Sequence, residues 1–354
     1  MKNGGKTMNK IMLTIIAICV IIPIIGCKNG NLNNVDTKKS IDNNISQMSG
    51  EEKKFLFSGD LERESVLLKP QDEVYKYNES GKIIIAMYHK FSEVETDEFC
   101  RSFDNFKKDL EYLYALGYRT ISLNDYLNNN IKVPIGCTPI ILTFDDGSNG
   151  QFNLIKSGDK LVANPNSAVG IMEKFYEEHP DFGLNGTFYI NGTNIFTGEG
   201  TVKERLDYLI NEGFEIGNHT NTHVNFSKAS IEEIQKEIGI VNNMVKSLTG
   251  YQMNSLALPY GINSKNNKEY IHKGSCDSVE YENKIILLVG AEPASSPNSE
   301  NVNLLSLPRV RASGGNKRID FDLYYWLEKM EETPSMKYVR LHNEDVDSHN
   351  GDVH

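Results

Sequence analysis

Two adjacent carboxylates, Asp145 and Asp146, stand at the end of an apolar run in residues 140–147 and directly precede a glycine. A continuous apolar run is typical of a strand whose two faces are both covered, as in parallel α/β folds, where catalytic residues lie at the carboxyl ends of strands. Successive strand residues point to opposite sides, so one carboxylate can bind a metal while the other accepts a proton. The alternative is an Asp-Gly hairpin turn that has no function.

A second group of polar residues lies downstream, where the short strand pattern of residues 214–218 runs into His219 and His223. On a helical turn, residues four apart place their Cβ atoms about 5–6 Å from each other, close enough to share one ion. Two imidazoles and one carboxylate make a three-ligand site with a position left for water, as in catalytic zinc centres. The alternative is a pair of surface histidines, but the combination with the Asp-Asp-Gly strand end favours a metal site.

These two segments together resemble a known family. Residues 143–147, Thr-Phe-Asp-Asp-Gly, and residues 219–223, His-Thr-Asn-Thr-His, resemble the first two motifs of the polysaccharide deacetylases, the NodB-like carbohydrate esterase family 4. The resemblance extends from about residue 83 to residue 311. It implies an α/β fold, a distorted (β/α) barrel of the polysaccharide deacetylase (NodB homology) type.

The resemblance also implies roles for the motif residues. The first aspartate of the family motif is the general base, which corresponds to Asp145 in this chain. The second aspartate and the two histidines hold a divalent metal, so the expected ligands are Asp146, His219 and His223. Zinc is the metal that these ligand types favour most, with cobalt, nickel or manganese as alternatives.

The third family motif, Arg-x-Pro-Tyr, is only partly present, because residues 257–261 read Ala-Leu-Pro-Tyr-Gly. In the family this arginine pairs with the catalytic base, and a nearby cation favours the charged form of a carboxylate. We hypothesise that Arg309 or Arg311, near the end of a predicted strand, replaces it beside Asp145. The tyrosine of the motif, Tyr260, is expected to give a backbone N–H to the developing oxyanion.

The last two family motifs are blurred. After a predicted strand at residues 285–290, the turn-rich segment 292–297 contains no Asp-Trp, and the single tryptophan, Trp326, is expected in the core. The fifth motif, Leu-x-His, would supply the general acid, but Leu341 and His342 are adjacent here. A shift of one residue turns a strand side chain to the other face, so His342 is a candidate for the general acid rather than a direct match to the motif. The alternative is that Asp145 returns the proton it has taken.

Elements with β-α-β order must position these residues. Apolar runs and capping residues predict the strands 83–89, 118–123, 140–145, 186–191, 214–218 and 285–290, and helices that begin after Ser102, Ser167, Lys203 and Ser230. His89 is interpreted as a strand-end histidine with its own partners rather than a residue of the cleft. Asn191 is expected to face substrate, and residues 147–167 are expected to form a long loop along the glycan groove.

The amino terminus has the pattern of an export signal. Three lysines precede an uncharged apolar run at residues 11–25, and Ile-Ile-Gly-Cys resembles a lipobox that ends at Cys27. The expected product is a lipoprotein anchored at Cys27, and the alternative is an uncleaved signal anchor. The predicted division is a signal peptide at 1–27, a tether and extension at 28–80, a catalytic domain at 81–342 and a polar tail at 343–354. Cys100, Cys137 and Cys276 are expected to be buried apolar residues, with one disulfide pair left open.

The formal net charge of −11 argues against nucleic acid as a partner, because phosphate binding favours a basic face. The expected function is metal-dependent removal of N-acetyl groups from a cell-surface or extracellular N-acetylglucosamine-containing polysaccharide. The expected protein is a monomer on the outer face of the cell membrane, within the cell envelope. The alternatives are a xylan-type O-acetyl esterase and a non-catalytic glycan-binding surface lipoprotein, and the sequence does not identify the glycan.

Overall fold

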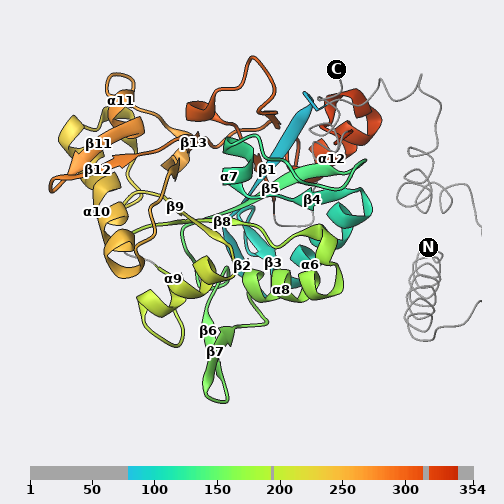
Figure 1. The fold of residues 1–354 in the computed structure, drawn as a ribbon, viewed down its shortest axis with the longest axis horizontal. Coiled ribbons are helices and arrows are strands. Elements are labelled where there is room, and N and C mark those ends of the chain that lie inside the picture. Colours follow the sequence, from blue (N-terminus) through green and yellow to red (C-terminus); the bar gives the residue numbers. More distant parts are fainter. Residues whose placement is uncertain (1–78, 193–194, 314–318, 342–354) are drawn as a thin grey trace, which may run out of the picture. The chain divides into compact units, whose positions relative to one another are not determined.

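The computed structural model describes residues 79–192, 195–313 and 319–341. All of them belong to one compact unit, Ser58–His354 (Figure 1). The predicted signal peptide, Cys27, most of the predicted tether, His342 and the polar tail lie outside the described residues. Within the part of the chain that is described, no helix is both long and apolar enough to span a membrane.

The apolar runs of the sequence form a central sheet of nine strands. Its main path is β13-β10-β9-β8-β5-β1-β14, with β15 beside β1 and β4 beside β5. The strands are β1 (Lys82–Tyr88), β4 (Tyr118–Thr120), β5 (Thr138–Asp145), β8 (Thr187–Ile190), β9 (Glu215–Asn218), β10 (Ser255–Ala257), β13 (Ile285–Leu287), β14 (Ala294–Ser295) and β15 (Val310–Arg311). All neighbours pair in parallel except β1 and β14. Every residue of β5 is buried, as its unbroken apolar run predicts.

The parallel register brings the predicted motifs to one edge of the sheet. Phe144 of β5 pairs with Tyr88 of β1 on one side, and Asp145 pairs with Tyr189 of β8 on the other. Tyr189 in turn pairs with Gly217 of β9, two residues before the first motif histidine. The residues that follow β1, β5 and β9 therefore lie close together at the carboxyl edge of the sheet.

One short segment, residues 307–311, connects the two sides of the curled sheet. Leu307 forms a parallel bridge with Leu287 of β13, and Val310 pairs with Ala86 of β1. The N–H of Leu307 donates to the carbonyl of Ile286, which fixes the first of these contacts. The sheet thus curls into the predicted distorted (β/α) barrel, with this segment at its seam.

Helices cover the sheet, and their starts follow the predicted caps. Ser102, Ser167 and Ser230 each accept a backbone N–H from three residues further on. The helix predicted after Lys203 begins slightly earlier, behind the capping box of Thr201. The helices are α6 (Phe103–Ala115), α7 (Leu123–Leu127), α8 (Ala168–Glu178), α9 (Val202–Asn211), α10 (Ile231–Thr249), α11 (Lys268–His272) and α12 (Leu323–Glu332). Short 3-10 turns occur at Pro180–Phe182, Phe226–Lys228, Pro259–Gly261, Leu304–Ser306 and Pro334–Met336.

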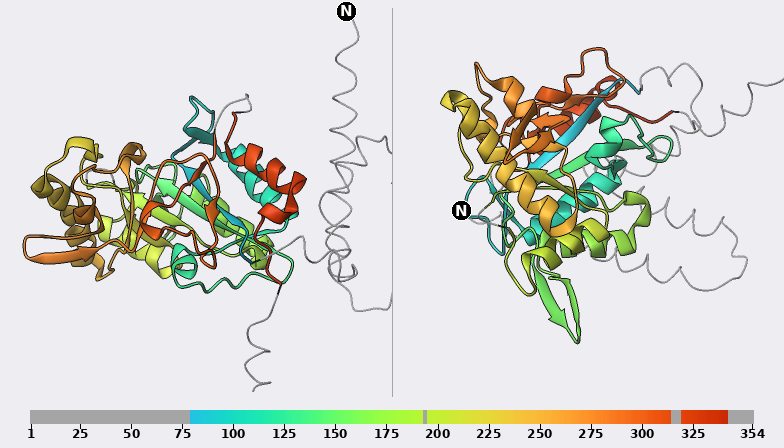
Figure 2. Two further views of the ribbon diagram at one scale, coloured as in Figure 1. Left: turned by 90° about the horizontal axis from the view of Figure 1, so that it is seen from above. Right: turned by 60° about the vertical axis from the view of Figure 1, so that its left-hand side comes forward.

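Residues 147–167 are not the long loop that was predicted. They contain an antiparallel hairpin, β6 (Leu154–Ser157) and β7 (Lys160–Ala163), with Gly158 at φ 61° in its turn. The hairpin projects from the body of the unit in both Figure 1 and Figure 2. Two other small sheets pair β2 (Lys90–Ser92) with β3 (Cys100–Ser102) and β11 (Lys273–Cys276) with β12 (Val279–Glu282).

The remaining side-chain predictions have mixed outcomes. Cys100 and Cys137 are buried and Cys276 is half-buried, and these three cysteines of the described chain are free. Trp326 is half-buried against the core, with its Nε1–H donated to the carbonyl of Ala291.

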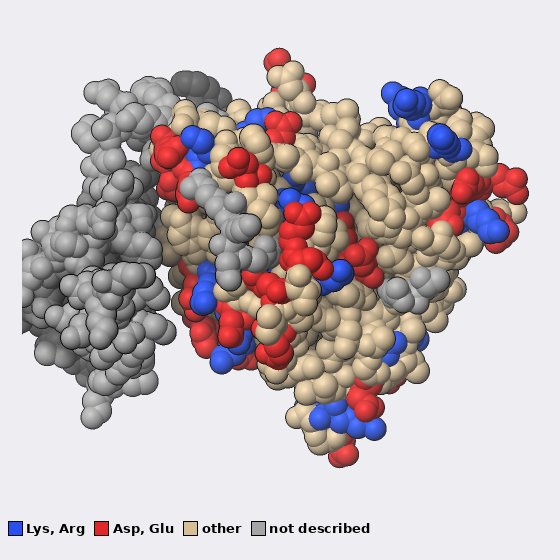
Figure 3. Space-filling view, turned by 180° about the vertical axis from the view of Figure 1, so that it is seen from behind, with Lys and Arg blue, Asp and Glu red and all other residues tan. Residues whose placement is uncertain are grey.

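On the face in Figure 3, charged groups of both signs alternate with broad uncharged areas, rather than forming one continuous basic surface.

Candidate active site

Asp145, the last residue of β5, is completed by an arginine from the far end of the chain. Its Oδ1 and Oδ2 lie 2.7 Å from Nη1 and Nη2 of Arg309, a two-pronged ion pair. Both side chains are buried, and Arg309 has no exposed surface. Arg309 Nε also donates to the carbonyl of Leu288 at 2.9 Å, and its Nη1 donates to Thr143 Oγ1 at 3.2 Å. Arg309 is therefore held by hydrogen bonds to two parts of the sheet, at Leu288 directly after β13 and at Thr143 in β5.

The ion pair sets the charge of Asp145. Burial by itself raises the pKa of this carboxyl, but Arg309 and then His219 lower it more, so the pKa of Asp145 stays well below its usual range. A carboxylate in this state is ionised at neutral pH and can accept a proton. Of the two arginines proposed from the sequence, Arg309 is thus the one that contacts Asp145. Arg311 pairs instead with Glu98 at 3.1 Å.

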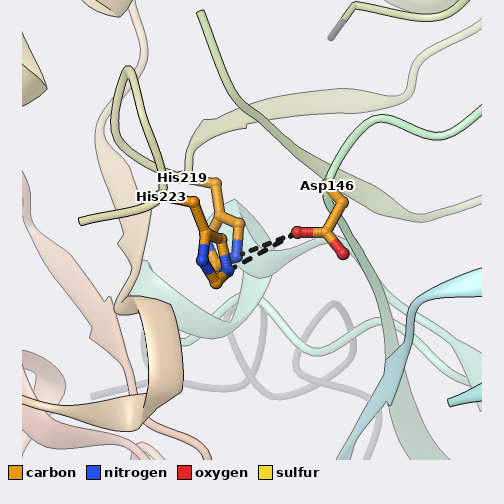
Figure 4. Close-up of side chains that lie close together, drawn as sticks. All are labelled: Asp146, His219 and His223. Carbon is orange, nitrogen blue, oxygen red and sulfur yellow. Dashed lines mark ion pairs between the residues drawn. The ribbon is translucent and has the colours of Figure 1, made fainter. Parts of the chain in front are cut away.

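Asp146, His219 and His223 form a cluster beside Asp145, and Figure 4 shows both imidazoles turned toward the Asp146 carboxylate. Asp146 Oδ1 lies 3.5 Å from His219 Nε2 and 3.7 Å from His223 Nε2. One atom from each of the three side chains lies within 4.8 Å of the others. Ligands about 2.0–2.2 Å from a tetrahedral zinc lie about 3.3–3.6 Å apart, so this donor set fits a divalent metal.

The surroundings of His219 prepare it as a ligand. Its Nδ1 lies 2.8 Å from the carbonyl of Ala257, which leaves Nε2 directed at Asp146. This arrangement, in which the second ring nitrogen is held by a carbonyl, is common for histidines that bind metals. Burial lowers the pKa of His219, which favours the neutral ring that a metal requires. His223 and Asp146 are about one third exposed, so the cluster is open on one side.

The segment between the two histidines is not the helical turn that their spacing suggested. It is an irregular loop in which Thr220 and His223 have φ angles of 65° and 57°. This left-handed conformation is uncommon for residues other than glycine. The rings of His219 and His223 nevertheless lie with their centroids 4.9 Å apart. The ligands converge through the course of the loop rather than through helical periodicity.

Neighbouring elements hold this loop in place. Glu237 of α10 accepts the N–H of Thr222 at 2.7 Å and its hydroxyl at 3.0 Å. Asn191, after β8, donates to the carbonyls of His219 and Thr220 at 2.7 and 3.0 Å. The prediction that Asn191 faces substrate is therefore wrong, because this amide is buried and engaged with the loop. It positions the histidine motif instead.

A cavity of about 300 Å³ opens over Asp145 and the cluster. It is lined by Met87, His89, Lys90, Phe99, Asp145, Asp146, His219, His223, Leu258, Tyr260 and Val289. His89 Nε2 lies 3.9 Å from Asp145 Oδ2, and burial lowers the pKa of this imidazole. The interpretation of His89 as a residue outside the cleft is therefore wrong. The signal was present in the sequence, because His89 follows β1 as Asp145 ends β5.

The Pro-Tyr-Gly segment lies at the mouth of the same cavity. Tyr260 has a left-handed backbone, with φ 59°, and its side chain is 61% exposed. Its ring meets His223 edge-on at a centroid distance of 4.7 Å. The motif thus contacts the cluster at His223 and forms part of the wall of the cavity.

The predicted general acid, His342, lies outside the described residues. Leu341 just before it donates its N–H to Glu79 Oε1, and Arg340 donates its N–H to the carbonyl of Cys137. Cys137 directly precedes β5, whose other end carries Asp145. The role of His342 as the general acid stays a prediction.

Part of the chain is similar to known proteins. Residues 132–274 match the polysaccharide deacetylase family model. A Listeria monocytogenes peptidoglycan-N-acetylglucosamine deacetylase, PgdA, is 28% identical over 153 residues, which are 41% of this chain and 28% of that protein. The Bacillus subtilis peptidoglycan-N-acetylmuramic acid deacetylase PdaC is 28% identical over 122 residues, 34% of this chain and 21% of that protein. Residues 132–274 are therefore similar to the polysaccharide deacetylases, and the matched segment spans less than a third of these two relatives.

Solved structures agree on the fold. The Streptococcus pyogenes deacetylase PplD, in complex with acetate, superposes with a TM-score of 0.52 at 18% identity, covering 71% of this chain and 99% of that one. A polysaccharide deacetylase from Bacillus cereus gives the same TM-score at 17% identity, with 71% and 69% covered. The predicted fold, a distorted (β/α) barrel of the polysaccharide deacetylase type, is confirmed.

Proposed function

We propose that this protein is a metal-dependent hydrolase that removes N-acetyl groups from an N-acetylglucosamine-containing polysaccharide of the cell envelope. The observation that supports this most directly is the buried Asp145 carboxylate, paired with Arg309 at 2.7 Å, beside the cluster of Asp146, His219 and His223. A binding module does not need an ionised base next to three metal ligands. The peptidoglycan deacetylases among the relatives support a cell-wall glycan as substrate.

Asp145 is the proposed general base. Its oxygens, kept ionised by Arg309, take a proton from the water that attacks the acetyl carbonyl, a function that contributes about 10²–10⁴-fold to rates. A divalent metal held by Asp146, His219 and His223 would supply Lewis-acid polarisation of that carbonyl. Zinc suits two imidazoles and one carboxylate, and cobalt, nickel or manganese accept the same ligands.

Two further groups complete the proposed mechanism. The backbone N–H of Tyr260, at the cavity wall, donates to the developing oxyanion, and such a donor is worth about 3 kcal/mol. The departing nitrogen receives a proton from Asp145, which returns the one it took. His89 Nε2, 3.9 Å from Asp145 Oδ2, is a second carrier for this proton. His342 stays a candidate from sequence alone.

The test is release of acetate from N-acetylglucosamine oligomers by the purified full chain, with zinc or cobalt added and with Asp145→Asn as the control. We expect metal-dependent release that the substitution lowers by at least about 100-fold. Acetate released only from acetylated xylan would point to an O-acetyl esterase. No release from either substrate, while the metal binds with one-to-one stoichiometry, would leave a glycan-binding protein.

The location of the activity is also proposed. The apolar run at residues 11–25 and the lipobox-like Ile-Ile-Gly-Cys support export and lipidation at Cys27, on the outer face of the membrane. Two acyl signals give stable anchoring, whereas one chain binds membranes only marginally. We expect the protein in the membrane fraction and expect Cys27→Ala to release it or to retain its signal uncleaved, as shown by fractionation and mass measurement.

A further inference from the structure

The hydrogen-bond ladder between β1 and β5 stops just before the two cavity residues that these strands carry. Its last residue pair is Tyr88 with Phe144, so His89 and Asp145 each lie one residue beyond it. Their side chains nevertheless approach each other, with His89 Nε2 3.9 Å from Asp145 Oδ2. A contact other than the ladder must therefore fix the separation of these two strand ends.

Gln151 provides such a contact. Its Nε2 donates hydrogen bonds to the backbone carbonyls of both His89 and Asp145, and the residue has no exposed surface. The opposite orientation of the amide would place its oxygen against two carbonyl oxygens, so these contacts determine which end of the amide faces the strands. Gln151 thus adds one further link between β1 and β5, made by a side chain instead of by the backbone.

The backbone of Gln151 is held independently of this amide. Its N–H donates to the carbonyl of Ser148 at 3.0 Å, and its own carbonyl accepts the N–H of Val169, in the first turn of α8, at 3.0 Å. A Cβ added to Gly150 would lie 2.2 Å from the carbonyl oxygen of Phe91 in β2. The segment is therefore packed tightly between α8 and β2, which gives the amide a well-anchored base.

The other end of the Gln151 amide is unsatisfied. Its Oε1 is buried and accepts no hydrogen bond from the described residues. A buried polar atom without a partner is unfavourable for the folded state. A methionine of similar length would fill the same space without this cost, so the two donated hydrogen bonds are what distinguishes the amide at this position.

We propose that Gln151 is a positioning residue, which holds the backbones of Asp145 and His89 at the separation that the proposed proton transfers require. This inference rests on the proposed deacetylase function, in which Asp145 takes a proton from water and His89 is a second carrier. Gln151 is not among the residues that line the catalytic cavity, so it acts through these two residues and not on the substrate. A displacement of about 1 Å in a reacting group can lower a rate by about 100-fold.

The kinetic test compares Gln151→Met with the wild-type full chain on N-acetylglucosamine oligomers at saturating zinc. Methionine is similar in length but donates no hydrogen bond. We expect kcat for acetate release to fall by about 10- to 100-fold while KM stays within about twofold, because the changed side chain lies outside the cavity. Gln151→Asn keeps the NH₂ group on a shorter stem that cannot span both carbonyls, and it should give an intermediate loss.

Asn283→Leu is the matched control. Asn283 also has no exposed surface, donates its Nδ2 to the carbonyl of Ile271 at 2.7 Å, and has a buried Oδ1 without a partner among the described residues. It does not line the catalytic cavity. Loss of a buried amide is therefore matched in the two variants, and melting curves by circular dichroism compare their stability. The value of kcat should change only in the Gln151 variants.

Two further measurements do not depend on turnover. Hydrogen–deuterium exchange, followed by mass spectrometry, should become faster at residues 86–92 and 143–149 in Gln151→Met, and should be unchanged there in Asn283→Leu. In wild-type protein with ¹⁵N-labelled glutamine, magnetic resonance should detect slowly exchanging NH₂ protons from Gln151, because both protons are engaged in the interior. This measurement requires no variant, so the proposal stays testable even if the variants do not fold.

Several results would overturn the proposal: a wild-type kcat in folded Gln151→Met, an equal loss of kcat in Asn283→Leu, a loss of activity through KM alone, or rapid exchange of every glutamine NH₂ group in the wild-type protein. If the wild-type protein releases no acetate but exchange at the two strand ends rises only in Gln151→Met, the deacetylase function fails while the link between the strands stands. If acetate is released and kcat does not depend on Gln151, only the positioning role fails.

Discussion

The two halves of the candidate site are completed in different ways. Asp145 and Arg309 are fully buried, and each satisfies the charge of the other without any ligand. Asp146 and His223 are about one third exposed, and with His219 they form a cluster that could hold a divalent metal. The proposed base is complete within the chain, whereas the proposed ligand cluster would be completed by a metal ion. The first half should therefore stabilise the folded protein without a metal, whereas the second half should stabilise it only when a metal binds.

The largest expected effect tests the buried half. Arg309→Met leaves the Asp145 carboxylate buried without its cation, and we expect the free energy of unfolding to fall by about 3–5 kcal/mol in urea titrations. The matched control is Arg311→Met, which removes a partly exposed pair with Glu98 and should cost less than about 1 kcal/mol. Equal losses in the two variants would show that the buried ion pair stabilises the protein no more than the partly exposed one does.

The next effect tests the open half. Zinc at 100 times its dissociation constant should stabilise the wild-type protein by about 2.7 kcal/mol, because it binds only the folded state. In His223→Ala, which lacks one proposed ligand, we expect most of this gain to disappear in melting curves with and without zinc. Asp145→Asn, which changes the base and leaves the ligands, should keep the gain. A gain that persists in His223→Ala would contradict the proposed ligand set.

The pH dependence of the free energy of unfolding tests the buried half of the site in the metal-free protein. Because the pKa of folded Asp145 is below its unfolded value of about 3.9, the ion pair contributes fully above that pH and is lost as the pH falls through the folded pKa. The stability advantage of the wild-type protein over Asp145→Asn should hence shrink by about 2 kcal/mol on acidification from pH 6 toward pH 2. Urea titrations at several pH values measure it, and a constant difference would refute the pairing.

The smallest expected effect concerns the loop that carries the histidines. Glu237→Gln weakens the contacts to Thr222, and we expect the zinc dissociation constant to rise by about 10-fold while the fold is retained. Glu233→Gln is the control, since it makes the same change at an exposed residue in the first turn of the same helix. If the affinity for zinc is the same in both variants, the loop does not need Glu237 to position its ligands.

The cluster of Asp146, His219 and His223 and the strand that ends at Asp145 could be predicted because both are local patterns. An apolar run that ends in Asp-Asp-Gly and a His-x-x-x-His segment can be read within ten residues each. The pairing of Asp145 with Arg309 joins positions 164 apart, and it depends on β15 lying beside β1. The sequence could narrow the partner to Arg309 or Arg311, but only the register of the sheet separates them.

Other predictions failed where the backbone is irregular. The left-handed angles of Thr220 and His223 have no signal in residue types that normally avoid them, so the spacing of the histidines predicts a helical turn where the structure has a loop. The hairpin at residues 154–163 does have a signal in the sequence, since Gly158 stands between two short apolar segments. The sequence does not determine what Asn191 contacts. A polar residue at the end of a strand can either face a cavity or form hydrogen bonds with a neighbouring loop.

The seam formed by residues 307–311 has a consequence for how the enzyme is made. All three proposed ligands and Asp145 are synthesised before residue 224, but the arginine that pairs with the base follows more than eighty residues later. A nascent or clipped chain that stops before Arg309 has the residues to hold a metal, but it lacks both the cation beside the base and the segment that bridges β13 and β1. If the proposed function is correct, loss of the last residues of the chain would therefore separate metal binding, which such a fragment could keep, from hydrolysis, which would require the closed barrel.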